Sequence, residues 1–248
     1  MPRPFVQNYD LIFADKDYDK DIDVFEALED TAPLLDKRVI EIGGGTGNHT
    51  LRLAPKVGQL VSVETDADFA QILRLKLASS GLRNVTLVDG PVENLGEMGF
   101  DAAAAFFHVL NYMGQTQLPA FLSGLADRLK TGACFVADVW NGAAAVLDPP
   151  RPEIRNKTVG TKLITQRIRP TLDAAQRTVT LNYEIDITGE GQVEKLTERI
   201  DLYLWQREEL ASALAQAGLS EVMFWDYRQF PQPARPDSWR LWLRAIRD

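Results

Sequence analysis

The chain has 248 residues, 45% of them hydrophobic, and carries a formal net charge of −8. This length can bury a full core, and it fits one α/β domain with an addition better than two equal domains. The acidic balance opposes a phosphate backbone, and the basic residues between Arg151 and Arg169 are scattered. We therefore expect no nucleic-acid partner.

Cysteine usage and apolar runs bear on the cellular compartment. Cys134 is the only cysteine and lies in an apolar stretch, which rules out an intramolecular disulfide and favours a buried thiol. No early apolar stretch follows a basic start, and no run approaches the length needed to cross a bilayer. We therefore expect a cytoplasmic protein without a membrane partner.

The N-terminal segment mixes aromatic and charged residues before the first long helix. It contains Tyr9-Asp10 and then Lys16-Asp17-Tyr18. A mixed-charge run ordinarily forms a solvated face. Apolar residues recur at roughly helical spacing after it, which predicts a helix over residues 22–35.

The most informative stretch is an apolar run that leads into a glycine-rich turn. Residues 39–42 predict a strand buried on both faces. Gly43, Gly45 and Gly47 follow without β-carbons, so backbone N–H groups can approach a ligand, and a helix opening near Asn48 directs its positive end to the same place. A nucleotide-like ligand is expected here.

The spacing narrows the class of nucleotide. Dinucleotide-binding folds carry a glycine at the sixth position of the turn, which is Asn48 when counted from Gly43. The chain instead reads Glu41-x-Gly-x-Gly-x-Gly, and a second strand over residues 59–64 ends in Glu64. This pattern resembles the first motif of the class I S-adenosylmethionine (SAM) methyltransferases. The resemblance implies that the glycines contact the methionine part of SAM, that Glu41 orients it and that Glu64 binds both ribose hydroxyls.

The N-terminal pairs add to this resemblance. Tyr9-Asp10 and Lys16-Asp17-Tyr18 resemble signatures of sugar-nucleotide N-methyltransferases and related small-molecule methyltransferases. The resemblance implies a lid that folds over the cofactor, with Tyr18 beside the cofactor and Tyr9 on the substrate side.

The next βα unit supplies one more cofactor candidate. A helix is predicted over residues 67–79, with Gly81 as its left-handed cap, and a strand over residues 84–88. The resemblance implies that Asp89 binds the adenine amino group. An ordinary strand-ending Asp-Gly turn is the alternative.

Chemistry is expected where the fourth strand ends. Residues 100–107 predict this strand, and ligands in open α/β sheets bind beyond the carboxyl ends of the strands. His108 and Tyr112 follow and are the catalytic candidates. A hydroxyl acceptor would need one of them as a base, whereas an amine acceptor only needs to be unprotonated. His49 is interpreted as a packing or cofactor-side residue.

The fifth strand is predicted over residues 133–140, after a helix over 118–129 and a turn at 130–132. Trp140 and Asn141 follow its end and are expected to border the substrate pocket. No Asp/Asn or His/Cys cluster stands at the end of strand four, so we expect no metal.

An addition follows the fifth strand. Residues 142–157 are rich in alanine and proline and predict a loop, and residues 162–168, 178–187 and 193–205 predict three antiparallel strands. Because this addition starts at the carboxyl end of strand five, we expect it to stand over the active site and to supply substrate contacts or a homodimer face.

The C-terminal part returns to the core. It predicts a helix over residues 206–217 and strands over 221–227 and 238–246, the antiparallel hairpin typical of class I methyltransferases. The expected fold is a Rossmann-like, seven-stranded α/β sheet with helices on both faces. Residues 1–141 and 206–248 form the SAM-binding core, and residues 142–205 form the β insertion.

The expected function is transfer of a methyl group from SAM to an amine or hydroxyl of a small molecule. The lid signature and the insertion together look most like nucleotide-sugar N,N-dimethyltransferases, which makes a nucleotide-linked amino sugar one candidate acceptor. Two alternatives stay open: a non-catalytic protein of the same fold that binds SAM or S-adenosylhomocysteine (SAH) or serves in assembly, and a nicotinamide-dependent oxidoreductase, which would also place Glu64 on a ribose.

Overall fold

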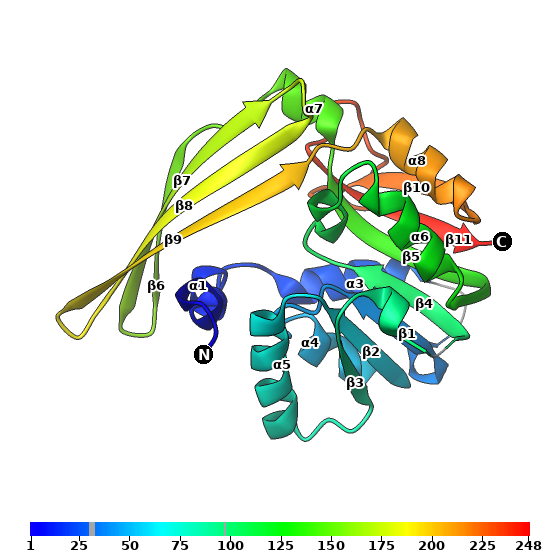
Figure 1. Ribbon diagram of the computed structural model, residues 1–248, viewed down its shortest axis with the longest axis horizontal. Coiled ribbons are helices and arrows are strands. Elements are labelled where there is room, and N and C mark those ends of the chain that lie inside the picture. Colours follow the sequence, from blue (N-terminus) through cyan, green and yellow to red (C-terminus); the bar gives the residue numbers. More distant parts are fainter. Residues whose placement is uncertain (30–32, 97) are drawn as a thin grey trace.

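The computed structural model describes residues 1–29, 33–96 and 98–248. It contains a seven-stranded sheet with helices on both faces and a separate four-stranded antiparallel sheet (Figure 1). The predicted Rossmann-like fold with a β insertion is therefore confirmed. No helix in the described part of the chain is long and apolar enough to span a membrane.

The large sheet has the strand order β10-β11-β5-β4-β1-β2-β3. Its parallel strands are β1 (Arg38–Ile42), β2 (Gln59–Glu64), β3 (Val85–Asp89), β4 (Phe100–Ala105) and β5 (Leu129–Trp140). The hairpin of β10 (Leu219–Asp226) and β11 (Arg240–Arg247) closes it antiparallel to β5, as predicted. The strand order reverses between β1 and β4, and this switch point is where such sheets bind ligands.

Successive side chains of the central strands point to opposite faces of this sheet and fill a separate hydrophobic core on each face. Ile40 and Ile42 pack with α6 (Gln117–Ala126) and α8 (Arg207–Gln216). Val39 packs on the other side with α3 (Tyr18–Leu28) and α4 (Thr50–Leu53). The alanines of β4 are fully buried, so helices approach both of its faces closely. Helix α5 (Ala67–Ser80) covers β2 and β3 and ends at Gly81 with a left-handed φ of 75°.

The first long helix begins earlier than its apolar spacing predicts. Asp17 is the N-cap and its side chain accepts a hydrogen bond from the Lys20 amide at 2.9 Å, so α3 starts at Tyr18. Helix α3 ends at Leu28, and a 3₁₀ turn, η1 (Leu34–Asp36), precedes β1. The predicted helix to residue 35 is therefore wrong at its C-terminal end, and its residues 30–32 lie outside the described residues.

Two strand boundaries also differ from the prediction. Strand β4 ends at Ala105 because the amides of Phe107 and His108 turn away to Asp138. Strand β5 begins at Leu129, so the predicted helix over 118–129 ends too late and the predicted turn at 130–132 is wrong. Gly132 instead takes a left-handed φ of 81° within the strand, near a shift in the β4–β5 register.

The insertion contains four strands rather than three. They are β6 (Glu153–Val159), β7 (Lys162–Asp173), β8 (Thr178–Gly189) and β9 (Gln192–Tyr203), paired in that order. The predicted loop over 142–157 is wrong, because it holds the helix α7 (Gly142–Leu147) and the edge strand β6. Most of β6 is exposed, so its sequence lacks the alternation that reveals a half-buried strand.

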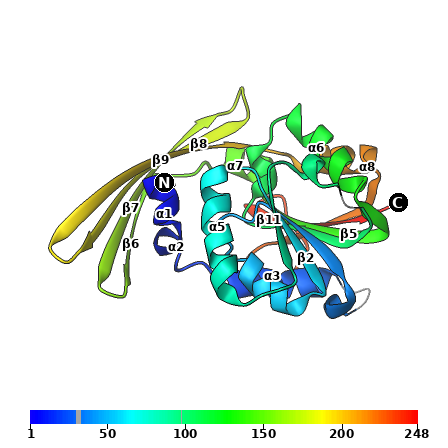
Figure 2. The same cartoon turned by 60° about the horizontal axis from the view of Figure 1, so that its bottom comes forward.

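The four-stranded sheet packs on the N-terminal arm, which we define as residues 1–16. The arm contains α1 (Pro4–Gln7) and α2 (Tyr9–Ile12), which lie between that sheet and α5 (Figures 1 and 2). Phe5, Val6 and Ile12 form a third core with the inner face of the sheet. The outer face carries ion pairs such as Arg169–Glu184. The homodimer face predicted for the insertion stays a prediction.

Candidate functional site

A cavity of about 1930 Å³ lies beyond the carboxyl ends of β1, β2 and β4 and reaches the four-stranded sheet. Its walls come from the glycine turn, the segment after β4, the N-terminal arm and the insertion. Pockets for one small ligand are usually about 300–1,000 Å³. The cavity can therefore hold two ligands side by side.

The glycine turn has the backbone that only glycines adopt easily. Gly43, Gly45 and Gly47 have left-handed φ values of 73°, 57° and 90°. Gly43 and Gly45 line the cavity, whereas a β-carbon on Gly47 would lie 2.6 Å from the Leu73 side chain of α5. A β-carbon on Gly43 would likewise lie 2.6 Å from Val109. Two of the glycines thus face the ligand space, and Gly47 allows α5 to pack against the turn.

Glu64 ends β2 at the wall of the cavity. Its carboxylate accepts hydrogen bonds from the amides of Gly45 at 2.7 Å and Asp66 at 2.8 Å. Burial raises its pKa above the ordinary glutamate value. Each carboxylate oxygen has two lone pairs, so both can still accept a ligand hydroxyl.

Glu41 lies behind the turn rather than on the cavity wall. One oxygen accepts hydrogen bonds from Thr50 at 2.5 Å and Ser62 at 2.8 Å, which tie the turn to β2. The other, Oε1, has no hydrogen-bond partner among the residues that the structure describes. Burial raises the pKa of Glu41 to about 7. Its predicted cofactor contact stays a prediction.

Asp89 also lies off the cavity wall. It ends β3 beside Glu64, and its side chain forms an exposed ion pair with Arg74 at 3.1 Å. The following residues, Pro91 to Glu93, line the cavity instead. The predicted contact of Asp89 with adenine stays a prediction.

The N-terminal arm closes over the glycine turn. Asp10 accepts hydrogen bonds from the Thr46 hydroxyl at 2.6 Å and the Asn48 amide at 2.9 Å, and it forms an ion pair with Lys76 of α5. Tyr9 lies one residue earlier and lines the cavity. These contacts of Asp10 place the arm at the position expected for the predicted lid.

Tyr18 opens α3 next to the turn. Its ring lies edge-on to His49, with centroids 4.8 Å apart, and it lines the cavity. The side chain is buried, which raises the pKa of Tyr18 to about 12. Its hydroxyl has no hydrogen-bond partner in the described ranges. A buried, protonated hydroxyl of this kind can donate to a ligand.

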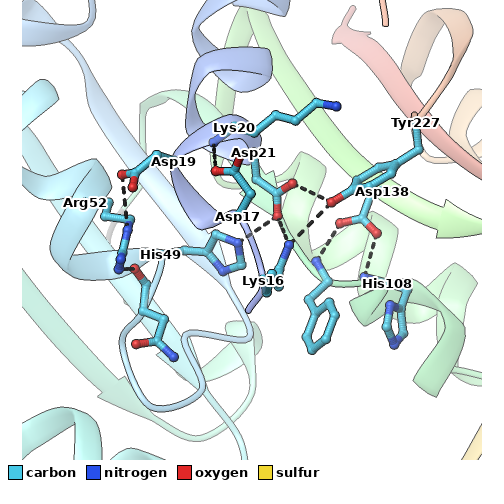
Figure 3. Close-up of polar contacts among 12 residues, drawn as sticks. Lys16, Asp17, Asp19, Lys20, Asp21, His49, Arg52, His108, Asp138 and Tyr227 are labelled. Carbon is cyan, nitrogen blue, oxygen red and sulfur yellow. Dashed lines mark hydrogen bonds and ion pairs between the residues drawn. The ribbon is translucent and has the colours of Figure 1, made fainter. Parts of the chain in front are cut away.

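The segment after β4 is held in a strained conformation by Asp138 of β5. Phe107 and His108 have φ values of 63° and 52°, and their amides donate to the Asp138 carboxylate at 2.5 and 2.9 Å (Figure 3). Arg240 donates to the same carboxylate at 2.6 Å. This arrangement fixes the backbone of His108 at the switch point of the sheet.

The His108 side chain is a buried, neutral imidazole. Burial, together with the positive charges of Arg240 and Lys16, holds its pKa well below the ordinary histidine value. Its Nδ1 atom has no hydrogen-bond partner in the part of the chain that the structure describes. Tyr112 stacks nearly parallel to it, with ring centroids 6.2 Å apart. The structure thus brings the two catalytic candidates together in the cavity.

Tyr112 exposes about half of its surface, 52%, and it lines the cavity. The cavity walls that surround the ring raise its pKa above the ordinary tyrosine value. The phenol therefore stays protonated near neutral pH.

The side chains of Trp140 and Asn141 have different surroundings in the structure. Trp140 lines the cavity and contacts His108 and Trp239, at 5.5 and 5.2 Å between ring centroids. Asn141 is buried, caps α7 through the Ala143 amide and donates to the carbonyl of Ser238. Its predicted substrate contact stays a prediction.

A buried charge cluster around Asp21 was not predicted from the sequence. Asp21 of α3 is fully buried and binds Lys16, His49 and the Tyr227 hydroxyl, the last two at 2.9 and 2.6 Å (Figure 3). His49 also stacks on Phe106, with centroids 4.6 Å apart. Charge alternation in residues 15–21 is typical of a solvated face, so no sequence signal distinguished Asp21. The described residues contain no group of three or more His, Cys, Asp or Glu that could hold a metal.

Known proteins share parts of this sequence and this fold. Residues 39–132 match a family model described as a methyltransferase domain. Solved structures that resemble nearly the whole chain include a SAM-dependent methyltransferase from Clostridium acetobutylicum, with a TM-score of 0.80 and 19% identity over 98% of this chain and 97% of the other. The chain has the SAM-dependent methyltransferase fold.

Other solved structures share this methyltransferase fold over similar lengths. DesVI from Streptomyces venezuelae has a TM-score of 0.82 and 17% identity, with both chains covered completely. The sugar N-methyltransferase KedS8 from Streptoalloteichus has a TM-score of 0.77 and 18% identity, over 96% of this chain and 92% of its own.

Two curated relatives match a shorter segment. Protein-L-isoaspartate O-methyltransferase 1 of Archaeoglobus fulgidus is 29% identical over 106 residues, which are 42% of this chain and 46% of the relative. The protein-L-isoaspartate O-methyltransferase of Alcanivorax borkumensis is 30% identical over 126 residues, 50% and 54% of the two chains. The matches thus span about half the length of these relatives.

Proposed function

We propose that this protein is an enzyme that transfers a methyl group from SAM to an amine of a small molecule. The observation that carries the proposal is the single cavity in which the glycine turn and Glu64 meet the segment that presents His108 and Tyr112. Its size leaves room for an acceptor beside the cofactor.

The residues around the glycine turn fit SAM. Gly43 and Gly45 offer a turn without β-carbons, Glu64 keeps lone pairs for two ribose hydroxyls, and the unpartnered hydroxyl of Tyr18 can donate to the ligand. When bound, SAM supplies a methyl group activated by a positively charged sulfur. The protein's part is to position the acceptor and to exclude water.

The pKa values of His108 and Tyr112 favour an amine over a hydroxyl as the methyl acceptor. A hydroxyl needs a base to remove its proton, but the depressed pKa of His108 makes it a weak base and Tyr112 stays protonated. A neutral amine already has a lone pair. The unpartnered Nδ1 of His108 can instead accept a hydrogen bond from the amine N–H and so orient that lone pair.

For the acceptor we propose a nucleotide-linked amino sugar. Support comes from the sugar N-methyltransferase among the structures that share the fold and from the charge on the cavity wall. Arg228 is exposed on the cavity wall, has no ion pair among the described residues and could bind a phosphate group. The other exposed arginines of the wall are paired with neighbouring carboxylates: Arg3, Arg151, Arg155, Arg199 and Arg235.

Binding measurements test the cofactor. We expect SAH to bind the purified protein in calorimetry and NADH not to bind. Glu64→Ala should weaken SAH binding by about 10- to 100-fold, because two hydrogen bonds from ribose hydroxyls to a carboxylate are lost. Asp127→Ala removes an exposed carboxylate outside the cavity and should leave affinity unchanged. Tight NADH binding without SAH binding would instead support an oxidoreductase.

A screen with methyl-labelled SAM tests the acceptor. We expect label to pass to nucleotide-linked amino sugars and not to the matching sugars that carry a hydroxyl in place of the amine. Transfer to the hydroxyl sugars alone would contradict N-methylation. SAH binding with no transfer to any amine or hydroxyl acceptor would favour a non-catalytic role.

A further inference from the structure

The insertion presents an apolar roof to the cavity with one unpaired charge in it. Strand pairing aligns Tyr183 with Glu198 and Leu181 with Ile200, and side chains at alternate positions share a face. The cavity-lining residues that share this face are Ile168 and Pro170 of β7, Leu181 and Tyr183 of β8, and Glu198 and Ile200 of β9. Five of these six are apolar or aromatic.

Glu198 has no hydrogen bond or ion pair with any residue in 1–29, 33–96 or 98–248. The other cavity-lining carboxylates of this sheet are paired, Glu153 with Arg155 and Asp201 with Arg199. Arg3 acts on Glu198 electrostatically, but its guanidinium is bound to Asp66 and Asp68. Partial burial raises the pKa of Glu198, which marks a carboxylate that lacks a cation.

A continuous row of aromatic rings lines the same cavity. Tyr9 lies 5.1 Å from Phe69 and 4.6 Å from Phe13, and Phe13 lies 5.4 Å from Phe107, all between ring centroids. Phe107 contacts His108, and His108 contacts both Tyr112 and Trp140. Trp140 in turn contacts Trp239. Glu198 is close enough to Tyr112 to act on it electrostatically. Aromatic faces attract organic cations.

We propose that Glu198 is a specificity-determining residue, which binds the amino group of the acceptor as an ammonium ion against the aromatic row. This inference rests on the proposed function and names the chemistry that selects its acceptor. A carboxylate and aromatic faces together favour a cation over a neutral hydroxyl of the same size. Recognition precedes the transfer, because the nitrogen must lose its proton to solvent before its lone pair can attack.

Small probes test this selection without knowledge of the natural acceptor. Binding of benzylamine, which is an ammonium ion at pH 7, is compared with binding of benzyl alcohol to the full chain saturated with SAH. We expect the wild type to bind benzylamine about tenfold more tightly, the size of one charge-assisted hydrogen bond. Glu198→Gln should remove this preference.

Glu184→Gln is the matched control. It removes one negative charge from the outer face of the same sheet, where Glu184 pairs with Arg169, and should keep the preference. A wild type that binds both probes equally, or a Glu198→Gln variant that still prefers benzylamine, would overturn the inference. SAH affinity measured in each sample distinguishes failure of this inference from failure of the proposed function. If a variant fails to fold, the comparison of benzylamine with benzyl alcohol on the wild type still tests the inference.

Discussion

His108 shows how single residues set the chemistry of this cavity. Its backbone is fixed by Asp138 and its ring is kept neutral by burial and two nearby cations. On the proposed function, it can orient an acceptor, but its low pKa makes it a weak base for a hydroxyl. Tyr112, stacked beside it, keeps its proton because its pKa is raised, so its hydroxyl can donate a hydrogen bond.

We expect His108→Ala and Tyr112→Phe each to lower the turnover rate by about 10- to 100-fold, because orientation is the main contribution that side chains make to this kind of transfer. SAH affinity should change less than about twofold, since neither residue lies at the glycine turn. Turnover and SAH binding measured on the same samples check this. Wild-type rates in both variants would place the chemistry elsewhere in the cavity.

Glu41 couples the stability of the turn to pH. Its pKa is raised from 4.5 to about 7 in the folded state, so the folded protein holds a proton that the unfolded chain releases. The stabilising contribution of this group to folding is fully present below pH 4.5 and is lost as the pH rises through 7. From pH 5 to pH 8 the loss is about 2 kcal/mol.

Glu41→Gln should avoid this loss, because a neutral amide oxygen can still accept from Thr50 and Ser62. We therefore expect the free energy of unfolding of the variant, relative to wild type, to be about 2 kcal/mol more favourable at pH 8 than at pH 5. Urea denaturation at both pH values measures this. An equal difference at the two values would show that Glu41 titrates normally in the folded state.

Among the elements, the N-terminal arm connects the glycine turn to the four-stranded sheet. It contacts the glycine turn through Asp10 and the four-stranded sheet through Lys157, which binds Asp15. The arm must release the turn before a ligand beneath it can leave. On the proposed function, we expect its hold on the turn to limit the rate of cofactor exchange.

Asp10→Ala should speed SAH dissociation by about tenfold, because it removes the contacts to Thr46, Asn48 and Lys76. Amide exchange in residues 1–16 should rise with it. Asp15→Ala loosens the arm from the sheet but not from the turn, and should leave SAH dissociation nearly unchanged. Stopped-flow dissociation and hydrogen exchange distinguish the two variants.

Elements with a strong apolar period could be predicted from the sequence, and those without one could not. Strand β2 and the alternating strand β8 were predicted closely, because each buries apolar side chains at regular spacing. Strand β6 is an exposed edge and α7 is a six-residue helix of mostly small residues, so neither leaves a pattern.

The candidate site divides in the same way. Gly43 and Glu64 belong to a local motif, and the structure places both on the cavity wall. Asp21 and Glu198 belong to no local motif, since their surroundings come from distant parts of the chain. Only the folded structure shows that one is buried and the other unpaired.

At the scale of the whole molecule, the cavity is shared between two units. The seven-stranded core supplies the glycine turn and the segment after β4, and the insertion supplies the roof. The chain leaves and rejoins the core at one place, because the Gly142 amide donates to the Trp205 carbonyl at 2.8 Å. The insertion can therefore be removed without opening a strand pair of the core.

Replacing residues 143–204 by a short Gly/Ser linker should leave a folded core that still binds SAH, with affinity about tenfold weaker because the arm loses its packing on the sheet. Methyl transfer should be abolished, since the roof is gone. Thermal unfolding, calorimetry and the labelled-SAM assay report these three properties. Retained activity would show that the insertion does not contact the acceptor.

The junction at Gly142 and Trp205 also has an evolutionary consequence. A cassette that begins and ends at one hydrogen bond can be exchanged between genes or lengthened strand by strand while the ladder of the core stays paired. On the proposed function, changes in the cassette would alter the roof while the glycine turn and Glu64 keep their places. Chimaeras that join this core to a foreign cassette at the same junction would test whether the cassette sets the acceptor.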